Sequence, residues 1–230
     1  MELKVRAVTA PEELGRLPAL ERLVWGSEDP VPVHLWAAVV HAGGVVLAAH
    51  PPGDPDDWWG FAAAFLGRDD DGWYLHSHMV GTLPAHQGQG VGRRLKHAQW
   101  RWAEQQGLGR LVWTYDPLQA KNAWFNLHIV GARVRRYVPD YYGVLNDELS
   151  GTRPSDRLVV EWRGQPPEPV PPGPWRVIEV PADITRLSRE DPEAAQQAVL
   201  RVRAAFESAL REGRRVVGFQ RGDRPGYLVQ

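Results

Sequence analysis

The stretch HQGQGVGRRLKHAQWRWAEQQG, residues 86–107, places glycine at positions 88, 90 and 92 directly before a helical pattern. The backbone N–H groups at a helix start have no partner within the helix and carry the positive end of its dipole. Because glycines let such a backbone approach an anion closely, a strand, a glycine loop and a helix in succession favour a phosphate site. Arg93 and Arg94 oppose the dipole there, and a bound polyanion would explain their placement. The alternative is an ordinary glycine-rich turn that binds nothing.

Two familiar phosphate loops do not fit this stretch. The nucleotide P-loop ends in Gly-Lys-Ser/Thr, which is missing here. The dinucleotide fingerprint requires G-x-G-x-x-G within an N-terminal βαβ unit, whereas the spacing here is G-x-G-x-G. Any phosphate site at this loop therefore belongs to another class.

The bulk composition excludes several classes of protein. The 230 residues carry a formal net charge of −1, which gives no support to nucleic-acid or anionic-membrane binding. No stretch approaches the roughly 20 apolar residues of a membrane span, and the N-terminus lacks the layout of a signal peptide. The absence of cysteine excludes disulfides, thiolate metal sites and a cysteine nucleophile. We expect a cytoplasmic protein without nucleic-acid or membrane partners, and a homodimer remains one option.

The hydrophobic periodicity predicts an α+β (mixed α/β) fold. Strands are expected at 3–9, 45–50, 56–69, 71–84, 110–116, 132–144 and 156–162. Helices are expected at 11–26, 31–44, 90–106 and 119–131. This order predicts a mostly antiparallel central sheet with helices on its faces.

The region after residue 163 has a different composition. A proline-rich connector at 163–175 precedes an expected strand at 175–180, a helix at 191–212 and a hairpin that turns at RGDRPG, residues 221–226. Because this small α/β segment is too short to be confidently autonomous, we expect it to pack on the main domain or on a partner chain.

The glycine loop with its flanks resembles the GCN5-related N-acetyltransferase (GNAT) superfamily, whose signature is Q/R-x-x-G-x-G/A. Gln87, Gly90 and Gly92 match that signature. VGTLPA at 80–85 and NAWFNLHIVGARV at 122–134 resemble the neighbouring family blocks. The resemblance implies the acyl-CoA N-acyltransferase fold, a twisted sheet flanked by helices, for a domain at 1–163, and leaves 164–230 as a segment of unknown role.

The resemblance also implies a coenzyme site. The co-substrate would be acetyl-CoA or another acyl-CoA, with no metal. Its pyrophosphate would lie on the backbone amides of the glycine loop, and its pantetheine arm would pair with the preceding strand where the sheet splays. Asn122 is a further candidate ligand, or else a polar residue on a solvated face. The expected coenzyme-binding residues are Val80, Gly81, Thr82, Gln87, Gly88, Gln89, Gly90, Val91, Gly92, Arg93 and Asn122.

Two histidines precede the loop on the same expected strand. Acyl transfer by direct attack of an amine requires a group that removes a proton from an ammonium. Strand alternation places His76 and His78 on one face and Ser77 on the other, and histidine titrates near neutral pH. Their offset from the loop resembles the histidine pair of the arylalkylamine N-acetyltransferases, to which proton removal is assigned, so both are catalytic candidates. The alternatives are hydrogen-bonded structural histidines, or a metal site that would need a third ligand.

The general acid has no candidate at its usual place. Many relatives carry a tyrosine four residues before the glycine that ends the helix of the second block, and counting back from Gly131 gives Leu127. Tyr115, Tyr141 and Tyr142 are substitutes that also suit packing roles.

The expected function is transfer of an acetyl group from acetyl-CoA to an amine of a small molecule. The alternatives are a catalytically silent CoA-binding or regulatory module, and an acyltransferase directed to hydroxyl groups or to proteins. The sequence does not identify the acceptor.

Overall fold

The computed structural model describes residues 3–143 and 153–230, so the last residue of the expected strand 132–144 lies outside the described residues. The chain packs as two compact units, residues 1–113 and 114–230. The expected α+β class with a mostly antiparallel sheet and flanking helices is confirmed. The expected domain boundary after residue 163 falls inside the second unit and stays a prediction.

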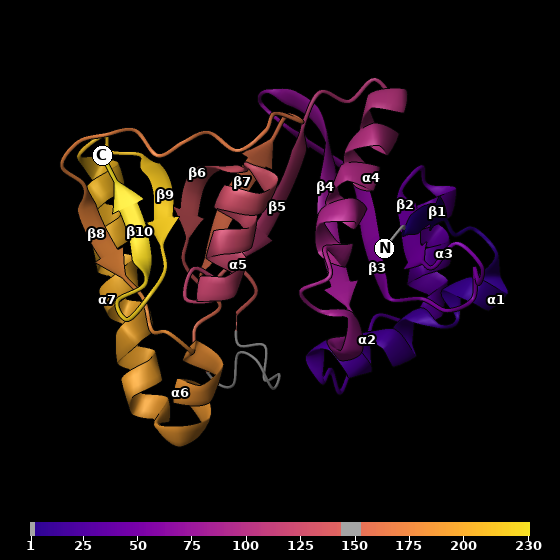
Figure 1. Ribbon diagram of the computed structural model, residues 1–230, viewed down its shortest axis with the longest axis horizontal. Coiled ribbons are helices and arrows are strands. Elements are labelled where there is room, and N and C mark those ends of the chain that lie inside the picture. The colour runs from indigo at the N-terminus through magenta and orange to yellow at the C-terminus, as the bar shows by residue number, and fades with distance from the viewer. Residues whose placement is uncertain (1–2, 144–152) are drawn as a thin grey trace. The chain divides into compact units, whose positions relative to one another are not determined.

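The first unit contains the expected order of strands, with three α-helices between β1 and β2 where two were expected (Figure 1). Its elements are β1 (Lys4–Ala7), α1 (Pro11–Leu14), α2 (Leu17–Trp25), α3 (Val33–His41), β2 (Val45–His50), β3 (Gly60–Asp69), β4 (Gly72–Thr82), the 3₁₀ helix η1 (Pro84–His86), α4 (Val91–Gln105) and β5 (Leu111–Tyr115). The last two residues of β5 belong to the second unit.

The sheet of the first unit is antiparallel from β1 to β4. Each of these strands pairs with the next one along the chain. β5 then pairs with β4 in parallel. The hairpin between β3 and β4 closes where Asp69 faces Gly72, which adopts φ +100° in the tight turn. The tight turn thus lies between the two expected strands 56–69 and 71–84.

Helices cover both faces of this sheet. α4 packs on β2, β3 and β4, as Figure 1 shows. The other face carries α1 to α3, whose Leu17 and Trp36 form a buried cluster with Phe61 and Ala63 of β3. The two sides of β4 therefore have different neighbours, α4 on one side and α1 to α3 on the other.

The expected helix at 11–26 is two helices, so the prediction of one continuous helix was wrong. α1 ends at Leu14, and Pro18 lies in the first turn of α2. A proline is favoured in a first helical turn, where its missing N–H costs nothing. Gly26 ends α2 in the left-handed conformation, as expected.

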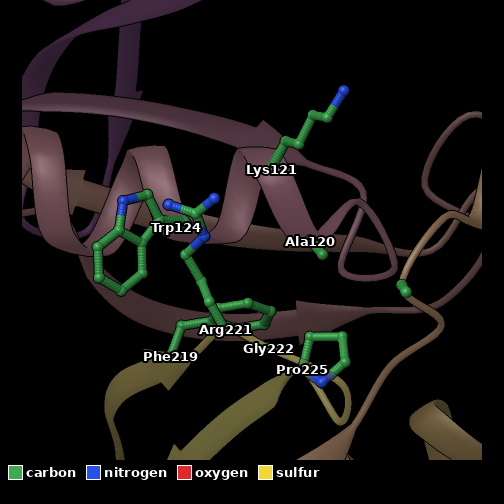
Figure 2. A pocket seen from close by; sticks show the side chains of 8 residues that line it. Ala120, Lys121, Trp124, Phe219, Arg221, Gly222 and Pro225 are labelled. Carbon is green, nitrogen blue, oxygen red and sulfur yellow. The ribbon is translucent and has the colours of Figure 1, made fainter.

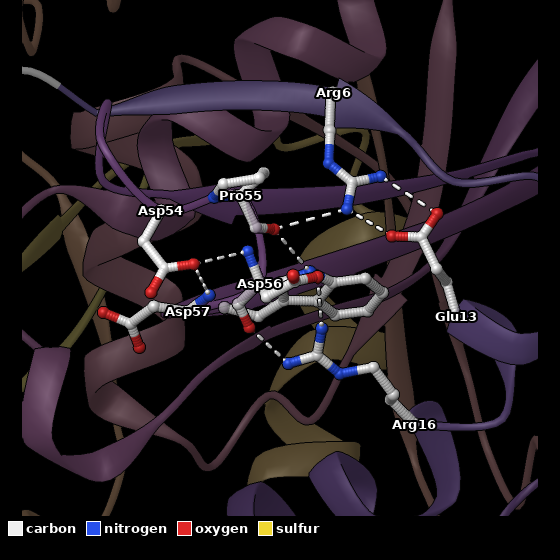
Figure 3. A network of polar contacts seen from close by, with 8 residues as sticks. Arg6, Glu13, Arg16, Asp54, Pro55, Asp56 and Asp57 are labelled. Carbon is white, nitrogen blue, oxygen red and sulfur yellow. Dashed lines mark hydrogen bonds and ion pairs between the residues drawn. The ribbon is translucent and has the colours of Figure 1, made fainter.

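A polar network holds the loop before β3 against the N-terminal elements (Figure 3). Arg6 forms an ion pair with Glu13 of α1 and donates a hydrogen bond to the Pro55 carbonyl at 3.3 Å. The Arg16 guanidinium lies 4.4 Å from the ring centre of Trp58, whose indole donates to the same Pro55 carbonyl at 3.1 Å. These contacts fix Trp58 in the core.

The second unit combines a β-hairpin-like pair with a small three-stranded sheet. Its elements are α5 (Ala120–Trp124), the π-helix η2 (Phe125–Val130), β6 (Arg133–Val138), β7 (Arg157–Trp162), β8 (Arg176–Glu179), α6 (Ile184–Glu190), α7 (Pro192–Arg211), β9 (Val216–Gln220) and β10 (Gly226–Val229). β6 and β7 are antiparallel, and the second sheet has the order β8-β10-β9. The hairpin of β9 and β10 and the helix that begins after Asp191 are as expected. α6 was not expected, although Asp183 caps it by accepting a hydrogen bond from the Arg186 amide.

The segment after residue 163 packs on residues 114–163 within this unit. Arg203 of α7 forms a two-pronged ion pair with the buried Asp156, which precedes β7. Tyr227 of β10 donates its hydroxyl to the Pro117 carbonyl at 2.8 Å. The C-terminal segment therefore packs on residues of the same chain, which is one of the two arrangements that we expected.

We expect replacement Asp156→Asn to lower the free energy of unfolding by about 3 kcal/mol, because it leaves the Arg203 guanidinium without its carboxylate. Asp156 is 2% exposed and also accepts hydrogen bonds from the Tyr137 hydroxyl and the Asp140 amide. Urea unfolding measures the change. Glu168→Gln is the matched control, because its exposed pair with Arg133 should contribute less than about 1 kcal/mol. Equal losses in the two variants would contradict the prediction.

Candidate active site

The glycine loop leaves the start of α4 open. Gly88 and Gly90 adopt φ of +77° and +81°, a region that favours glycine. A methyl group added at either position would meet no described atom within 4 Å. No side chain caps α4 at Gly90, so the first amide groups of the helix are not occupied by a capping residue. The loop therefore has both the backbone shape and the room for an anion.

The residues around the loop are mostly exposed. Gln87 follows η1, and Gln89 donates a hydrogen bond to the Ala85 carbonyl at 3.1 Å. Arg93 is exposed in the first turn of α4, and the Arg94 guanidinium lies 3.5 Å from the Leu3 carbonyl. The positive charge expected at this helix start is present.

His76 and His78 lie on the same side of β4. Their ring centres are 6.1 Å apart, and the Phe65 ring of β3 is 4.9 Å from one and 5.5 Å from the other. Tyr74 lies 6.3 Å from His76, and Trp36 of α3 lies 6.3 Å from His78. No described residue is hydrogen-bonded to either imidazole, which disfavours the alternative of hydrogen-bonded structural histidines.

A β-bulge at His78 was not expected. Ala63 of β3 faces Met79, whereas the next residue, Ala64, faces Ser77. His78 is therefore the extra residue in the ladder, and a bulged residue leaves its backbone groups unpaired. His78 lies on the same side of β4 as His76, and its side chain is partly accessible to solvent.

Both imidazoles are neutral at physiological pH. Burial lowers the pKa of His76 to about 4, with smaller contributions from the charges of His78 and Lys96. Burial also lowers the pKa of His78. A neutral imidazole has a free lone pair for a proton, but burial also disfavours the imidazolium that proton uptake would form.

The opposite face of β4 carries a buried polar cluster that the sequence analysis missed. The Ser77 hydroxyl donates to Gln99 at 2.7 Å and accepts from the Lys96 ammonium at 2.8 Å. The Lys96 nitrogen lies 3.5 Å from the ring centre of Trp113. Lys96 is 3% exposed, and burial lowers its pKa well below the ordinary value.

The end of β4 extends beyond its pairing with β5. The parallel ladder joins Leu75 to Leu111 and His76 to Val112, whereas β4 continues to Thr82. Val80, Gly81 and Thr82 therefore lie past this ladder. Gly81 is buried, and a side chain there would collide with the Phe61 and Trp25 rings.

The remaining sequence candidates lie in the second unit. Asn122 is exposed on α5. Tyr115 is buried, and burial raises its pKa. Tyr141 and Tyr142 are partly exposed and meet edge to face at 4.6 Å. These side chains stay predictions as ligand or general acid.

The π-helix changes the count that led to Leu127. Gly131 donates its amide to the Asn126 carbonyl, five residues earlier, instead of four as in an α-helix. The residue that lies one turn before Gly131 is therefore not the one that counting back four residues gives, Leu127. His128, within the π-helix, accepts a hydrogen bond from the Phe219 amide of β9 at 2.9 Å.

The second unit also contains two surface pockets. One, of about 340 Å³, is lined by α5, β9 and the following turn, and the Arg221 guanidinium lies 5.3 Å from the ring centre of Trp124 (Figure 2). The other, of about 560 Å³, runs along β6 and the proline-rich connector. Neither is lined by the glycine loop or the histidine pair.

Among residues 3–143 and 153–230, no group of three histidine, aspartate or glutamate side chains is placed to hold a metal ion. Within the same ranges, none of the helices is both long and apolar enough to cross a membrane.

Residues 16–126 match the acetyltransferase (GNAT) family. This region includes the glycine loop, the histidine pair and β5. The matched residues, 16–126, correspond to a GNAT acetyltransferase domain. The resemblance inferred from Gln87, Gly90 and Gly92 is thereby confirmed. None of the curated proteins matches the chain.

Solved structures of GNAT proteins share the fold of this chain. Naa50 of Arabidopsis thaliana, solved with a CoA–peptide bisubstrate analogue, is 16% identical at a TM-score of 0.55, over 70% of this chain and 99% of its own. YncA of Salmonella typhimurium, a putative acetyltransferase solved with acetyl-CoA, is 19% identical at 0.54, over 75% and 99%. Naa20 of Chaetomium thermophilum, solved with a bisubstrate analogue, is 18% identical at 0.53, over 70% and 86%.

The pKa of His76 predicts acid sensitivity of the GNAT domain. In the unfolded chain His76 becomes protonated below about pH 6.5, whereas in the folded chain it becomes protonated only near pH 4. The free energy of unfolding therefore decreases as the pH is lowered from 6.5 to 4. The full effect is about 3 kcal/mol. His76→Asn should lose less stability between pH 7 and pH 4.5 than the parent, as measured by urea unfolding at both values. Identical losses would show that His76 titrates normally.

Proposed function

We propose that this chain is an acetyl-CoA-dependent N-acetyltransferase that transfers the acetyl group to an amine of a small molecule. The proposal rests on the residues of β4 and of the glycine loop that follows it. β4 presents two neutral histidines without hydrogen-bond partners among the described residues, and the chain then forms a glycine loop at an uncapped helix start. The family supports the acetyl donor, and the histidines support amine deprotonation.

The residues present fit acetyl-CoA. The open space at Gly88 and Gly90 and the uncapped amides of α4 suit a pyrophosphate. The backbone of Val80 to Thr82, beyond the ladder with β5, suits the amide groups of a pantetheine arm. Asn122 is proposed as a further coenzyme contact. The bound donor supplies an activated acetyl thioester.

The chemistry asked of this chain is proton removal and positioning. His76 or His78 accepts a proton from the substrate ammonium, directly or through water. The free amine then attacks the thioester carbonyl carbon, so that a carbon–nitrogen bond forms and the carbon–sulfur bond breaks. The attacking nitrogen, positively charged after bond formation, releases its extra proton to solvent and becomes the amide nitrogen. The leaving thiolate takes up a proton from solvent or from a group not yet assigned. We further propose that the backbone N–H at the bulge donates to the developing negative charge, because a bulged residue leaves the regular ladder.

Ligand binding by the folded protein should raise its melting temperature. We expect acetyl-CoA and CoA to raise the midpoint of thermal unfolding and NADPH to leave it unchanged at the same concentration. At about 100 times Kd the stabilisation is about 2.7 kcal/mol. No rise with either CoA species would leave the glycine loop as a turn and would refute the proposal.

Replacement of both histidines tests catalysis separately from binding. We expect His76→Asn combined with His78→Asn to lower kcat by about 100-fold to 10,000-fold while the Kd of acetyl-CoA stays unchanged. The measurement is CoA release with a panel of small amines, alcohols and peptides, together with calorimetric titration of acetyl-CoA. His34→Asn, at an exposed histidine on α3, is the control.

The same panel decides between the alternatives. Turnover only with peptide amines or with alcohols would replace the small-molecule acceptor by a protein or hydroxyl acceptor. CoA binding without turnover of any acceptor would indicate a catalytically silent CoA-binding module.

A further inference from the structure

The Lys96 cluster lies where β4 and β5 stop pairing. The parallel ladder ends with the pair His76 and Val112. Ser77 and Trp113 are the next residues on the two strands, and within the first unit this ladder does not continue to them. The Lys96 nitrogen contacts both, the hydroxyl of Ser77 at 2.8 Å and the ring of Trp113 at 3.5 Å from its centre. One side chain from α4 thus reaches the two strands at the point where their pairing ends.

Burying a lysine at this position lowers the stability of the fold. Lys96 and Ser77 are 3% and 4% exposed, and Gln99 is fully buried with an amide nitrogen that has no partner among the described residues. The contacts of Lys96 are a hydroxyl and an aromatic ring, which compensate a buried cation less completely than a carboxylate does. An apolar side chain of similar length would pack there at lower cost. Proteins usually avoid burying a lysine without a carboxylate partner, and exceptions of this kind are expected at functional sites.

The contacts of Lys96 connect three parts of the proposed site. Lys96 lies on the helix that begins at the glycine loop, just over one turn after Val91. Ser77 separates the two histidines on β4. Trp113 continues β5 beyond the ladder. Any change in the Lys96 contacts therefore alters the helix start, the histidine strand and the separation of the two strands together.

We propose that Lys96 is a positioning residue that holds β4 and β5 apart beyond their last pair, so that the end of β4 stays available to the pantetheine arm of the coenzyme. The ammonium and its four-carbon stem act as a spacer of fixed length. Its hydrogen bond to Ser77 fixes the strand on one side, and its contact with the Trp113 ring fixes the strand on the other. This inference rests on the proposed use of acetyl-CoA.

The test separates coenzyme affinity from stability. We expect Lys96→Met to weaken acetyl-CoA binding by about tenfold, a change of about 1.4 kcal/mol, while its melting temperature stays equal to or above that of the parent. Calorimetric titration well below the midpoint gives Kd, and thermal unfolding gives the stability. Lys4→Met, at an exposed lysine on β1, is the matched control and should change neither.

Each outcome has one meaning. If the parent binds acetyl-CoA and Lys96→Met binds it equally well, the spacer role is wrong and the proposed function stands. If the parent does not bind acetyl-CoA, the proposed function fails, and the spacer role fails with it. If Lys96→Met does not fold, Ser77→Ala replaces it, because this change removes the acceptor of the lysine and should weaken binding similarly. Unchanged affinity in Ser77→Ala would then overturn the inference.

Discussion

The pairing of β3 with β4 is the constraint on which the first unit depends. It runs from Gly60 opposite Thr82 to Asp69 opposite Gly72, interrupted by one extra residue at His78. Because successive strand residues point to opposite faces, a slip of one residue would exchange the sides of His76 and Ser77. The pairing therefore determines which side of the sheet carries the imidazoles and which side carries the lysine cluster. It also ends where Leu83 donates to the Trp59 carbonyl at 2.9 Å, which leads the chain into the glycine loop.

The two faces of β4 handle polar groups in different ways. On the side of α3, the imidazoles lie among aromatic rings and lose their charge because of burial. On the side of α4, the lysine is held by a hydroxyl and an indole ring. The charge of Lys96 also lowers the pKa of His76 through the sheet, although burial is the larger cause. The strand thus brings a proton-accepting pair and a buried cation within electrostatic reach of each other.

Much of this arrangement could be predicted because it depends on local patterns. The glycine spacing gave the loop and the start of α4, and the alternation of His76, Ser77 and His78 gave their faces. The break between α1 and α2 has a local signal in Pro18, whereas the bulge at His78 and the π-helix before Gly131 could not be predicted, because each depends on packing with distant residues. Lys96 was missed for the same reason. A lysine on a helix is usually solvated, and only the positions of Ser77 and Trp113 show that this one is buried.

The long separations along the chain in the second unit affect how it folds. The hydrogen bond between His128 and Phe219 spans 91 residues, and that between Tyr227 and Pro117 spans 110. By contrast, the β3–β4 hairpin closes over a two-residue turn. Closing a longer loop costs more entropy, and folds rich in non-local contacts form more slowly. Contact order therefore predicts that the histidine strand is assembled early, whereas the docking of β9 and β10 on residues 117–128 is the slow step of folding.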